Sequence, residues 1–463
     1  MTNKRGLGVW MCTSLVAGSM IGSGIFLLPA SLAPFGGISI VGWLVSAGGA
    51  MCLALVLARL GATLPKVGGP YAYGREGFGD FVGFWIAWSY WISLLAGNAA
   101  LAVATASYAT VFWPVLAASP AAGLAMALAV LWTLALVNAH GVRTAGLVQL
   151  VTTVLKLLPL AAIGTVGFVY FQADHFQPFN PAGESPFSAV TATVALTLWA
   201  FLGLEAGTVP AGDVRDPART IPKATILGTS IAAVVYIACT AAVMGIIAPA
   251  ELASSTAPFA DAADSIWGTW GRWIIGAGAT ISCFGALNGW VLLTGQIPRA
   301  AALDGLLPAR FAHLSSRGTP VAGIFLSAAL ATILIAMNYT RGLVQAFTFL
   351  ILLATLATLL PYVFTSMTGL MMALRERARS RIHGRAAAGP LARAIVSVLA
   401  FGFSLWAVVG AGAETVFWGF LMLLAGVPVF AAMRWRRDGS SGSGSASGGG
   451  SGTPGDRAAE EWR

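Results

Sequence analysis

The stretch AGSMIGSGIF, Ala17–Phe26, lies inside the first long apolar run of the chain. It places three glycines and two serines where a membrane helix usually carries Leu and Ile. Two interpretations are open. Gly18 and Gly22 form a G-x-x-x-G face that lets two helices approach closely. Alternatively, the helix unwinds here, and its freed N–H and C=O groups face a cavity that can hold a charged ligand. A second interrupted helix elsewhere would favour the unwound interpretation.

The composition of the whole chain indicates an integral membrane protein. Of the 463 residues, 57% are hydrophobic and 9% are charged, and the mean hydropathy is +0.81. A soluble globular chain has about a quarter charged residues. Because a helix needs about 20 apolar residues to cross a bilayer, we expect about twelve membrane helices and no separate soluble domain. Their expected starts are Leu7, Gly37, Phe81, Pro120, Ala145, Ser188, Ala224, Trp273, Val321, Leu343, Ala394 and Val416.

The distribution of charge predicts how the chain is oriented. The formal net charge is +9, and the basic residues gather before the first run and after the even-numbered ones, as with Arg215, Arg219 and Lys223 after the sixth. The opposite loops carry mostly acidic residues. The positive-inside rule therefore predicts a multi-pass protein of the cytoplasmic (inner) membrane with both termini in the cytoplasm. The basic excess is a topology signal, and we expect the lipid bilayer rather than nucleic acid as its partner.

Alternative interpretations of the N-terminus and of the cysteines are weaker. Lys4 and Arg5 before an apolar run resemble a signal peptide, but the run is longer than the 7 to 15 residues of such a segment, so we interpret it as the first helix. The four cysteines all fall in apolar runs without short spacing, and the four histidines are scattered. We therefore expect neither a disulfide framework nor a metal site, and no cofactor is implied.

The C-terminal residues differ in composition from the rest of the chain. Residues 438–463 are rich in Ser and Gly and cannot bury apolar surface, so we expect a flexible cytoplasmic tail, either natural or a remnant of engineering. Residues 1–437 form the expected transmembrane domain. Within it we place two repeats at roughly 7–171 and 188–373, followed by two additional helices at roughly 392–435.

A counterpart to the first stretch lies in the sixth apolar run. The sequence TLWAFLGLEAGTV, Thr197–Val209, carries Gly203 and Gly207 around Glu205. A carboxylate in the middle of a membrane helix costs about 2.5 to 3.5 kcal/mol on insertion scales, so it normally faces a cavity and acts there. Runs one and six are five helices apart, and an odd offset turns the second copy upside down. The sequence therefore predicts an all-α fold with a five-plus-five inverted repeat, broken helices one and six, and a site at the midplane.

Several sequence blocks identify a resemblance to a known family. They are GSGIFLLPA, GGPYAYGREGFG, YWISLLAGNAA, TLWAFLGLEAGTV, STAPFADA, GWVLLTGQIPRAAALDGLLP and LLPYVFTSM, in this order. From about Leu7 to Arg434 the chain resembles the amino acid–polyamine–organocation superfamily, and within it the basic amino-acid/polyamine antiporters typified by the arginine/agmatine antiporter. The resemblance implies a secondary transporter that works by alternating access on small amino acids or amines. A homodimer is left open.

The resemblance also implies a set of site residues. Backbone amides near Ser23 and Gly24 would bind the substrate carboxylate, as the dipole of a half-helix N-terminus also favours. The implied substrate-binding positions are Ser19, Ile21, Ser23, Gly24, Ser93, Asn98, Trp199, Leu202, Trp290 and Ala354. The implied gating and proton-coupling positions are Tyr90, Lys156, Glu205 and Tyr362.

Departures from the arginine/agmatine antiporter concern the side-chain end of the substrate. Ser19 stands in place of an amide, Leu94 of a thiol, Leu101 of a thioether and Ala354 of a hydroxyl, so guanidinium specificity does not transfer directly. Lys156 resembles a lysine of other superfamily members that lies against the backbone of helix one. The competing interpretation is that Lys156 extends to the cytoplasmic surface, which its distance of thirteen residues from Arg143 disfavours.

From these features we expect an antiporter that exchanges an amino acid for a related amine. The alternative within the class is a proton-coupled amino-acid permease, which Lys156 favours. A membrane-embedded enzyme with Glu205 as general base is a remote alternative, because the sequence offers no second carboxylate, histidine or nucleophile beside it, and we expect no catalytic residue. ATP is not implied, since no phosphate-binding G-x-x-x-x-G-K-[ST] motif occurs.

Overall fold

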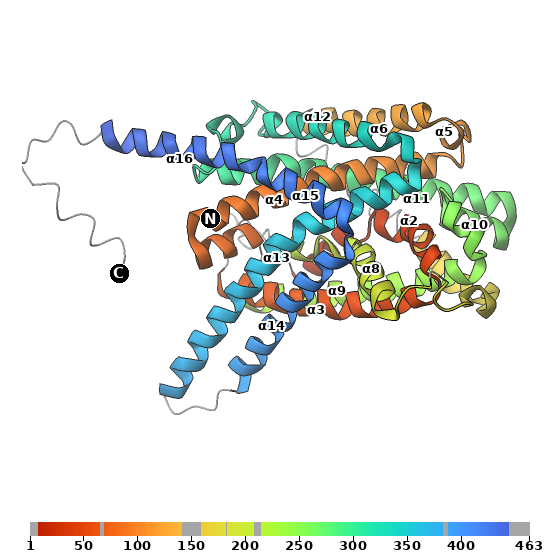
Figure 1. The fold of residues 1–463 in the computed structure, drawn as a ribbon, viewed down its shortest axis with the longest axis horizontal. Helices are drawn as coiled ribbons and strands as arrows, with labels where there is room; N and C mark the ends of the chain where they lie inside the picture. Colours follow the sequence, from red (N-terminus) through yellow and green to blue (C-terminus); the bar gives the residue numbers. More distant parts are fainter. Residues whose placement is uncertain are drawn as a thin grey trace, which may run out of the picture.

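The structure is a computed structural model that describes residues 8–64, 69–140, 159–181, 183–207, 214–382 and 388–443. These residues are predominantly α-helical (Figure 1). Among them, ten helices are long and apolar enough to cross a membrane, and the shorter apolar helices Pro159–Tyr170 and Pro186–Phe201 add two more. The all-α membrane fold with about twelve helices predicted from the sequence is therefore confirmed.

The helices follow one another with short connections. The first half contains α1 (Val9–Met20), α2 (Ser23–Leu32), α3 (Ile38–Thr63), α4 (Pro70–Ala109), α5 (Val115–Ala118) and α6 (Pro120–His140). After α8 (Pro186–Leu198), the second half continues with α9 (Pro217–Ile246), α10 (Pro249–Ser254), α11 (Pro258–Leu303), α12 (Val321–Asn338), α13 (Leu343–Ile382), α14 (Ala388–Gly410), α15 (Ala413–Leu424) and α16 (Gly426–Ser443).

Helix α4 forms the centre of the molecule. It packs against α13, α11, α6 and α12, and every residue from Ser89 to Ala109 is buried. A helix that is apolar on all sides is normally enclosed by others, and this segment fits that rule. α3 packs against α9, α8 and α14. Around the first interrupted helix, α1 packs against α9, and α2 packs against α11, α9, α8, α13 and α4.

Two helices begin more than ten residues before the starts that the hydropathy pattern predicted. α4 starts at Pro70 rather than near Phe81, and α11 starts at Pro258 rather than near Trp273. Each contains a kink at a glycine with positive φ, +79° at Gly79 and +67° at Gly268. Glycine takes this backbone conformation without the steric cost that a Cβ atom imposes. The polar segment before each kink is helical but not apolar enough to be recognised as part of a span.

The C-terminal helix extends beyond the predicted end of the membrane domain. α16 continues to Ser443, although we expected the flexible tail to begin at residue 438. Adding a residue to an existing helix costs less free energy than starting one, so the last turn propagates into Ser and Gly residues of low helix propensity. The rest of the predicted tail, 444–463, lies outside the described residues.

Candidate functional site

The first helix is interrupted where the glycines and serines predicted. α1 ends at Met20, Ile21 and Gly22 leave the helix, and α2 begins at Ser23. Gly22 has φ −144° and ψ −143°, and no side chain caps the new N-terminus. The first amide N–H groups of a helix have no acceptor within it, so α2 presents uncapped donors inside the protein.

Contacts of Phe26 with neighbouring helices hold α2 in place. The hydroxyl of Tyr108 on α4 donates a hydrogen bond of 2.6 Å to the carbonyl oxygen of Phe26. The Phe26 ring packs edge-on against Tyr108 and against Phe259 of α11, with centroid distances of 5.8 and 5.1 Å. This aromatic cluster fixes the direction in which the N-terminus of α2 points.

The sixth helix is interrupted at the predicted glycine. α8 passes into a 3-10 turn, Trp199–Phe201, and the chain then becomes extended at Leu202 before a second short turn, Leu204–Gly207. Gly203 has φ +102°, a value that a residue with a Cβ atom rarely adopts. The break therefore depends on glycine at this position.

The two breaks touch each other. The hydroxyl of Ser19, in the last turn of α1, donates to two carbonyl oxygens, that of Val16 over 2.9 Å and that of Gly203 over 3.0 Å. A Cβ atom added to Gly203 would lie 3.2 Å from the backbone and hydroxyl of Ser19, closer than most Cβ contacts. Ser19 thus satisfies a carbonyl freed by the second break, which is necessary because the membrane interior offers no water to do so.

The predicted carboxylate-binding residues lie at the start of α2. Ser23 is 1% exposed, and its hydroxyl has no hydrogen-bond partner in the described residues. Gly24 faces the other break rather than open space, since a Cβ atom added to it would lie 3.0 Å from Cδ1 of Trp199 and 3.2 Å from Cα of Ala200. Glycine is needed at position 24 at least in part for this close approach of helices one and six.

Two tryptophans form one wall of the site. Trp199 follows α8, Trp290 lies on α11, and their ring centroids are 5.3 Å apart with a tilt of 54°. Both rings lie over Gly97 of α4, where an added Cβ atom would be 2.4 Å from Trp290 and 3.2 Å from Trp199. Sequence reasoning missed Gly97. A lone glycine beside Asn98 within an apolar helix was the available signal, because such a glycine often marks a close approach.

Glu205 lies at the centre of a small hydrogen-bonded cluster. Glu205 is buried, with 3% of its surface exposed. The Tyr90 hydroxyl of α4 donates to Oε1 over 2.7 Å, and the Tyr362 hydroxyl of α13 donates to Oε2 over 2.9 Å. The N–H of Gly203 also donates to Oε2, over 3.3 Å. Sequence reasoning chose both tyrosines as gating aromatics, and the structure adds that their hydroxyl groups bind the carboxylate of Glu205.

The remaining predicted positions lie on α4, on α13 and at the breaks. Asn98 is 2% exposed, and its Oδ1 has no hydrogen-bond partner in the described residues. The Ser93 hydroxyl lies 2.5 Å from that of Thr358, which donates to the carbonyl of Ala354 one turn earlier. Sequence reasoning did not single out Thr358, whose hydroxyl has no distinguishing local pattern. Ile21 and Leu202 are buried apolar residues at the two breaks.

Lys156 lies outside the described residues, and its role stays a prediction. The other predicted site residues are brought together from helices distant in sequence: from the two breaks, from the middle of α4, and from α11 and α13. The arrangement combines uncapped helix amides, a pair of indole rings and a buried carboxylate within one region of the protein.

Comparison with known proteins identifies the family of the chain. A family model described as amino acid permease matches residues 7–433. The cadaverine/lysine antiporter of Escherichia coli K12 is 38% identical over 371 residues, which are 79% of this chain and 83% of that protein. The putrescine transporter PotE of Haemophilus influenzae is 32% identical over 435 residues, 93% of this chain and 98% of its own. PotE of Escherichia coli K12 is 32% identical over 424 residues, 91% and 94% of the two chains. The chain therefore belongs to the amino acid permease family, whose members are multi-pass membrane transporters.

Proposed function

We propose that this transporter is an antiporter that exchanges a basic amino acid for a related amine or polyamine by alternating access. Its relatives include an antiporter of cadaverine and lysine and two putrescine transporters, so both kinds of substrate occur among similar proteins. An amino acid and the amine made by its decarboxylation differ only in the α-carboxylate. The site must therefore hold the shared cationic part firmly and tolerate the presence or absence of the carboxylate.

One end of the site suits the carboxylate. Among the described residues, no side chain caps the N-terminus of α2, and the nearby Ser23 hydroxyl is buried without a hydrogen-bond partner. Amide donors at a helix N-terminus, together with the helix dipole, favour an anion. A substrate that lacks a carboxylate would leave these donors without an acceptor, so the site can distinguish the two exchanged substrates.

The other end suits a cation beside a polar group. The faces of Trp199 and Trp290 attract positive charge through the ring quadrupole, by about 0.5 to 2 kcal/mol for each ring. Asn98 immediately follows the glycine beneath both rings, and its buried Oδ1 is an acceptor that has no hydrogen-bond partner in the part of the chain that the structure describes. The single observation that carries the proposal is this pair of indole rings beside an uncapped helix N-terminus, a cation site next to an anion site.

An exchange experiment tests the proposal. Proteoliposomes are loaded with unlabelled lysine, arginine, ornithine, cadaverine, agmatine, putrescine or a neutral amino acid, and the uptake of labelled lysine is measured. We expect rapid uptake only into vesicles that contain a basic amino acid or its amine. Equal uptake into empty vesicles, driven by a proton gradient, would instead support a proton-coupled permease. Uptake that neutral amino acids support as well as basic ones would contradict the substrate class.

We expect Trp199→Leu and Trp290→Leu to weaken binding of cationic substrates. Leucine keeps an apolar side chain but lacks the ring quadrupole, so each substitution removes about 0.5 to 2 kcal/mol, which is a loss of affinity of between about twofold and thirtyfold. Neutral amino acids should lose less. Competition against labelled substrate in proteoliposomes measures both effects.

The control for this prediction keeps an aromatic face. Trp290→Phe should recover part of the affinity that Trp290→Leu loses, whereas Trp270→Leu, at a position with 73% exposure, should change nothing. Equal losses for cationic and neutral substrates would show that the rings only shape the site.

We also propose the orientation that the charge pattern predicts. The protein lies in the cytoplasmic membrane with both termini in the cytoplasm, and its repeats are residues 7–171 and 188–373. The arginines at the end of α13, Arg375, Arg377 and Arg379, then face the cytoplasm, as the positive-inside rule requires. A fluorescent reporter that matures only in the cytoplasm, fused to the C-terminus, should be bright. A dark fusion that is still inserted in the membrane would reverse the orientation.

A further inference from the structure

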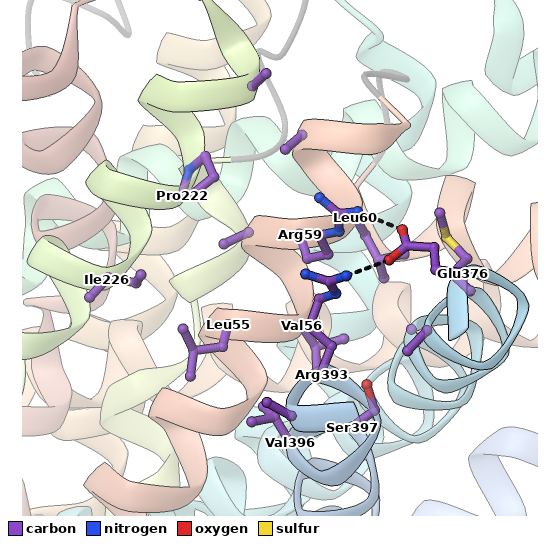
Figure 2. A pocket seen from close by; sticks show the side chains of 17 residues that line it. Leu55, Val56, Arg59, Leu60, Pro222, Ile226, Glu376, Arg393, Val396 and Ser397 are labelled. Atoms are coloured by element: carbon purple, nitrogen blue, oxygen red, sulfur yellow. Dashed lines mark hydrogen bonds and ion pairs between the residues drawn. The ribbon is translucent and has the colours of Figure 1, made fainter. Parts of the chain in front are cut away.

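A cavity of about 380 Å³ lies away from the substrate site, between α3, α9, α13 and α14 (Figure 2). None of the residues that line it belongs to the two broken helices. Its volume falls within the range of about 300 to 1,000 Å³ that is common for sites of small ligands. The walls are mostly aliphatic, with Leu55 and Val56 of α3, Ile226 of α9 and Val396 of α14 among them.

A cluster of three charged side chains lies at one end of this cavity. Glu376 of α13 accepts from Arg59 of α3 at Oε1, over 2.5 Å, and from Arg393 of α14 at Oε2, over 2.7 Å (Figure 2). One carboxylate thus faces two guanidinium groups, and the cluster has an excess positive charge. The three side chains are 30 to 43% exposed, and Nε of Arg393 is buried without a hydrogen-bond partner in the described residues. The Nε–H group of Arg393 therefore remains available as a hydrogen-bond donor to an anion.

Part of the surface beside the cavity is aliphatic, while the first turns of α9 also expose Arg219 and Lys223. Leu55 lines the cavity and is also exposed at the surface of α3. The neighbouring faces of α9 and α14 expose further aliphatic side chains, which are Leu227, Ile231, Val234, Ile395, Val398 and Leu399. Exposed aliphatic residues on membrane helices contact acyl chains, so the cavity opens toward the lipid rather than toward water.

From these observations we propose that the cavity binds one acidic phospholipid. The anionic phosphate of the headgroup accepts hydrogen bonds from Arg59 and Arg393, and an acyl chain occupies the aliphatic cavity. This proposal goes beyond the transport function and rests on the proposed orientation, in which this end of α13 faces the cytoplasm. The cytoplasmic leaflet carries the acidic lipids that attract such basic groups.

The charge pattern selects an acidic lipid over a zwitterionic one. A zwitterionic headgroup would place its own cation near the two arginines, whereas an acidic headgroup brings only negative charge to the cluster. Guanidinium groups also match the geometry of phosphate oxygens, because two N–H donors can bind two oxygens at once. Glu376 opposes the lipid charge, so the charge argument predicts that its neutralisation favours the lipid.

Native mass spectrometry of the full-length protein in detergent tests the proposal. Dioleoyl phosphatidylglycerol and dioleoyl phosphatidylcholine are titrated separately, so that the headgroup alone differs. We expect one tightly bound phosphatidylglycerol and no equivalent phosphatidylcholine. In the triple variant R59Q/E376Q/R393Q, which removes one net positive charge, phosphatidylglycerol should bind about fivefold more weakly.

Two variants make the test decisive. Glu376→Gln alone raises the net positive charge and should tighten phosphatidylglycerol binding about fivefold, an effect opposite in sign to that of the triple variant. The matched control R341Q/E414Q removes a different Arg–Glu pair, which joins the turn after α12 to α15, and should change nothing. Thermal unfolding verifies that each variant is folded.

Several outcomes would overturn the proposal. The proposal is wrong if the triple variant binds phosphatidylglycerol as tightly as the wild type does, or if phosphatidylcholine binds as tightly as phosphatidylglycerol. It is also wrong if Glu376→Gln and the triple variant both weaken phosphatidylglycerol binding. Displacement of the lipid by glycerol 3-phosphate at equal concentration would show that the site takes a free phosphate rather than a lipid. All of these results are independent of exchange activity, so they do not depend on the proposed substrate.

Discussion

Replacing Gly24 with Leu is expected to reduce substrate binding and exchange to background while the protein still inserts in the membrane. Even a Cβ atom at this position would lie 3.0 Å from Trp199 and 3.2 Å from the backbone of Ala200. A leucine therefore pushes the two broken helices apart, at an overpacking cost of about 1 to 3 kcal/mol or more. It also moves Trp199 and the uncapped start of α2, so that both ends of the site are displaced together.

Binding of labelled lysine to purified protein and exchange in proteoliposomes measure this effect. Gly24→Ala should lie between the wild type and Gly24→Leu, since its neighbours need to move by only a few tenths of an ångström. The matched control is Gly48→Leu on α3, where an added Cβ atom meets nothing within 4 Å among the described residues. If Gly24→Leu binds substrate with normal affinity, the start of α2 is not part of the site.

The second large effect is expected for Glu205→Gln, which should slow exchange about tenfold or more and flatten its dependence on pH. The carboxylate accepts hydrogen bonds from Tyr90 and Tyr362 and from the N–H of Gly203. A glutamine amide group offers one acceptor and one donor, so one tyrosine hydroxyl loses its acceptor. A lost hydrogen bond to a charged group costs about 1.5 to 3 kcal/mol, which corresponds to about tenfold or more.

The expected pH dependence has its physical reason in the hydrogen bonds that Glu205 accepts from Tyr90 and Tyr362. Tyr90 and Tyr362 donate to the carboxylate of Glu205, and a neutral side chain at this position would weaken both hydrogen bonds, because hydrogen bonds to a charged acceptor are the stronger ones. These tyrosines lie on α4 and α13, helices that also line the site. Because glutamine cannot gain or lose a proton in the working range, this coupling is absent from the variant. Exchange is measured at several values between about pH 5 and pH 8.

Tyr90→Phe is the control that separates charge from packing. It removes one hydrogen bond and keeps the ring, while Glu205 can still take up a proton. We expect a lower rate with the pH dependence retained. If Glu205→Gln keeps the pH profile of the wild type, the carboxylate is not the group that senses pH, and the role implied by the resemblance does not apply to this chain.

Much of the architecture was predictable from local sequence. The number of spans follows from apolar runs long enough for a bilayer, because the cost of burying polar groups in lipid is a property of each segment. The two breaks follow from Gly18, Gly22 and Gly24 in one helix and from Gly203 beside Glu205 in another. Glycine both weakens a helix and permits backbone conformations that other residues avoid, so its effect is visible without knowledge of the neighbours.

The helix ends were less predictable for a related reason. Hydropathy detects the part of a helix that lies in lipid, and it misses the polar turns before Gly79 in α4 and before Gly268 in α11. It also placed the end of the last helix at roughly 435, whereas the helix continues to Ser443. These turns are stabilised by backbone hydrogen bonds, which do not depend on whether the side chains are apolar.

Local sequence thus determined the membrane class, the number of helices, the two breaks and most of the residues near them. Only the tertiary structure decided how these residues meet: Gly97 beneath the two indole rings, Gly24 against Trp199, and Tyr90 and Tyr362 on Glu205, which they reach across 115 and 157 residues of chain. The physical reason is that hydropathy and helix breaking act on neighbours in the chain. A contact between distant residues depends on the packing of whole helices, which many side chains set together.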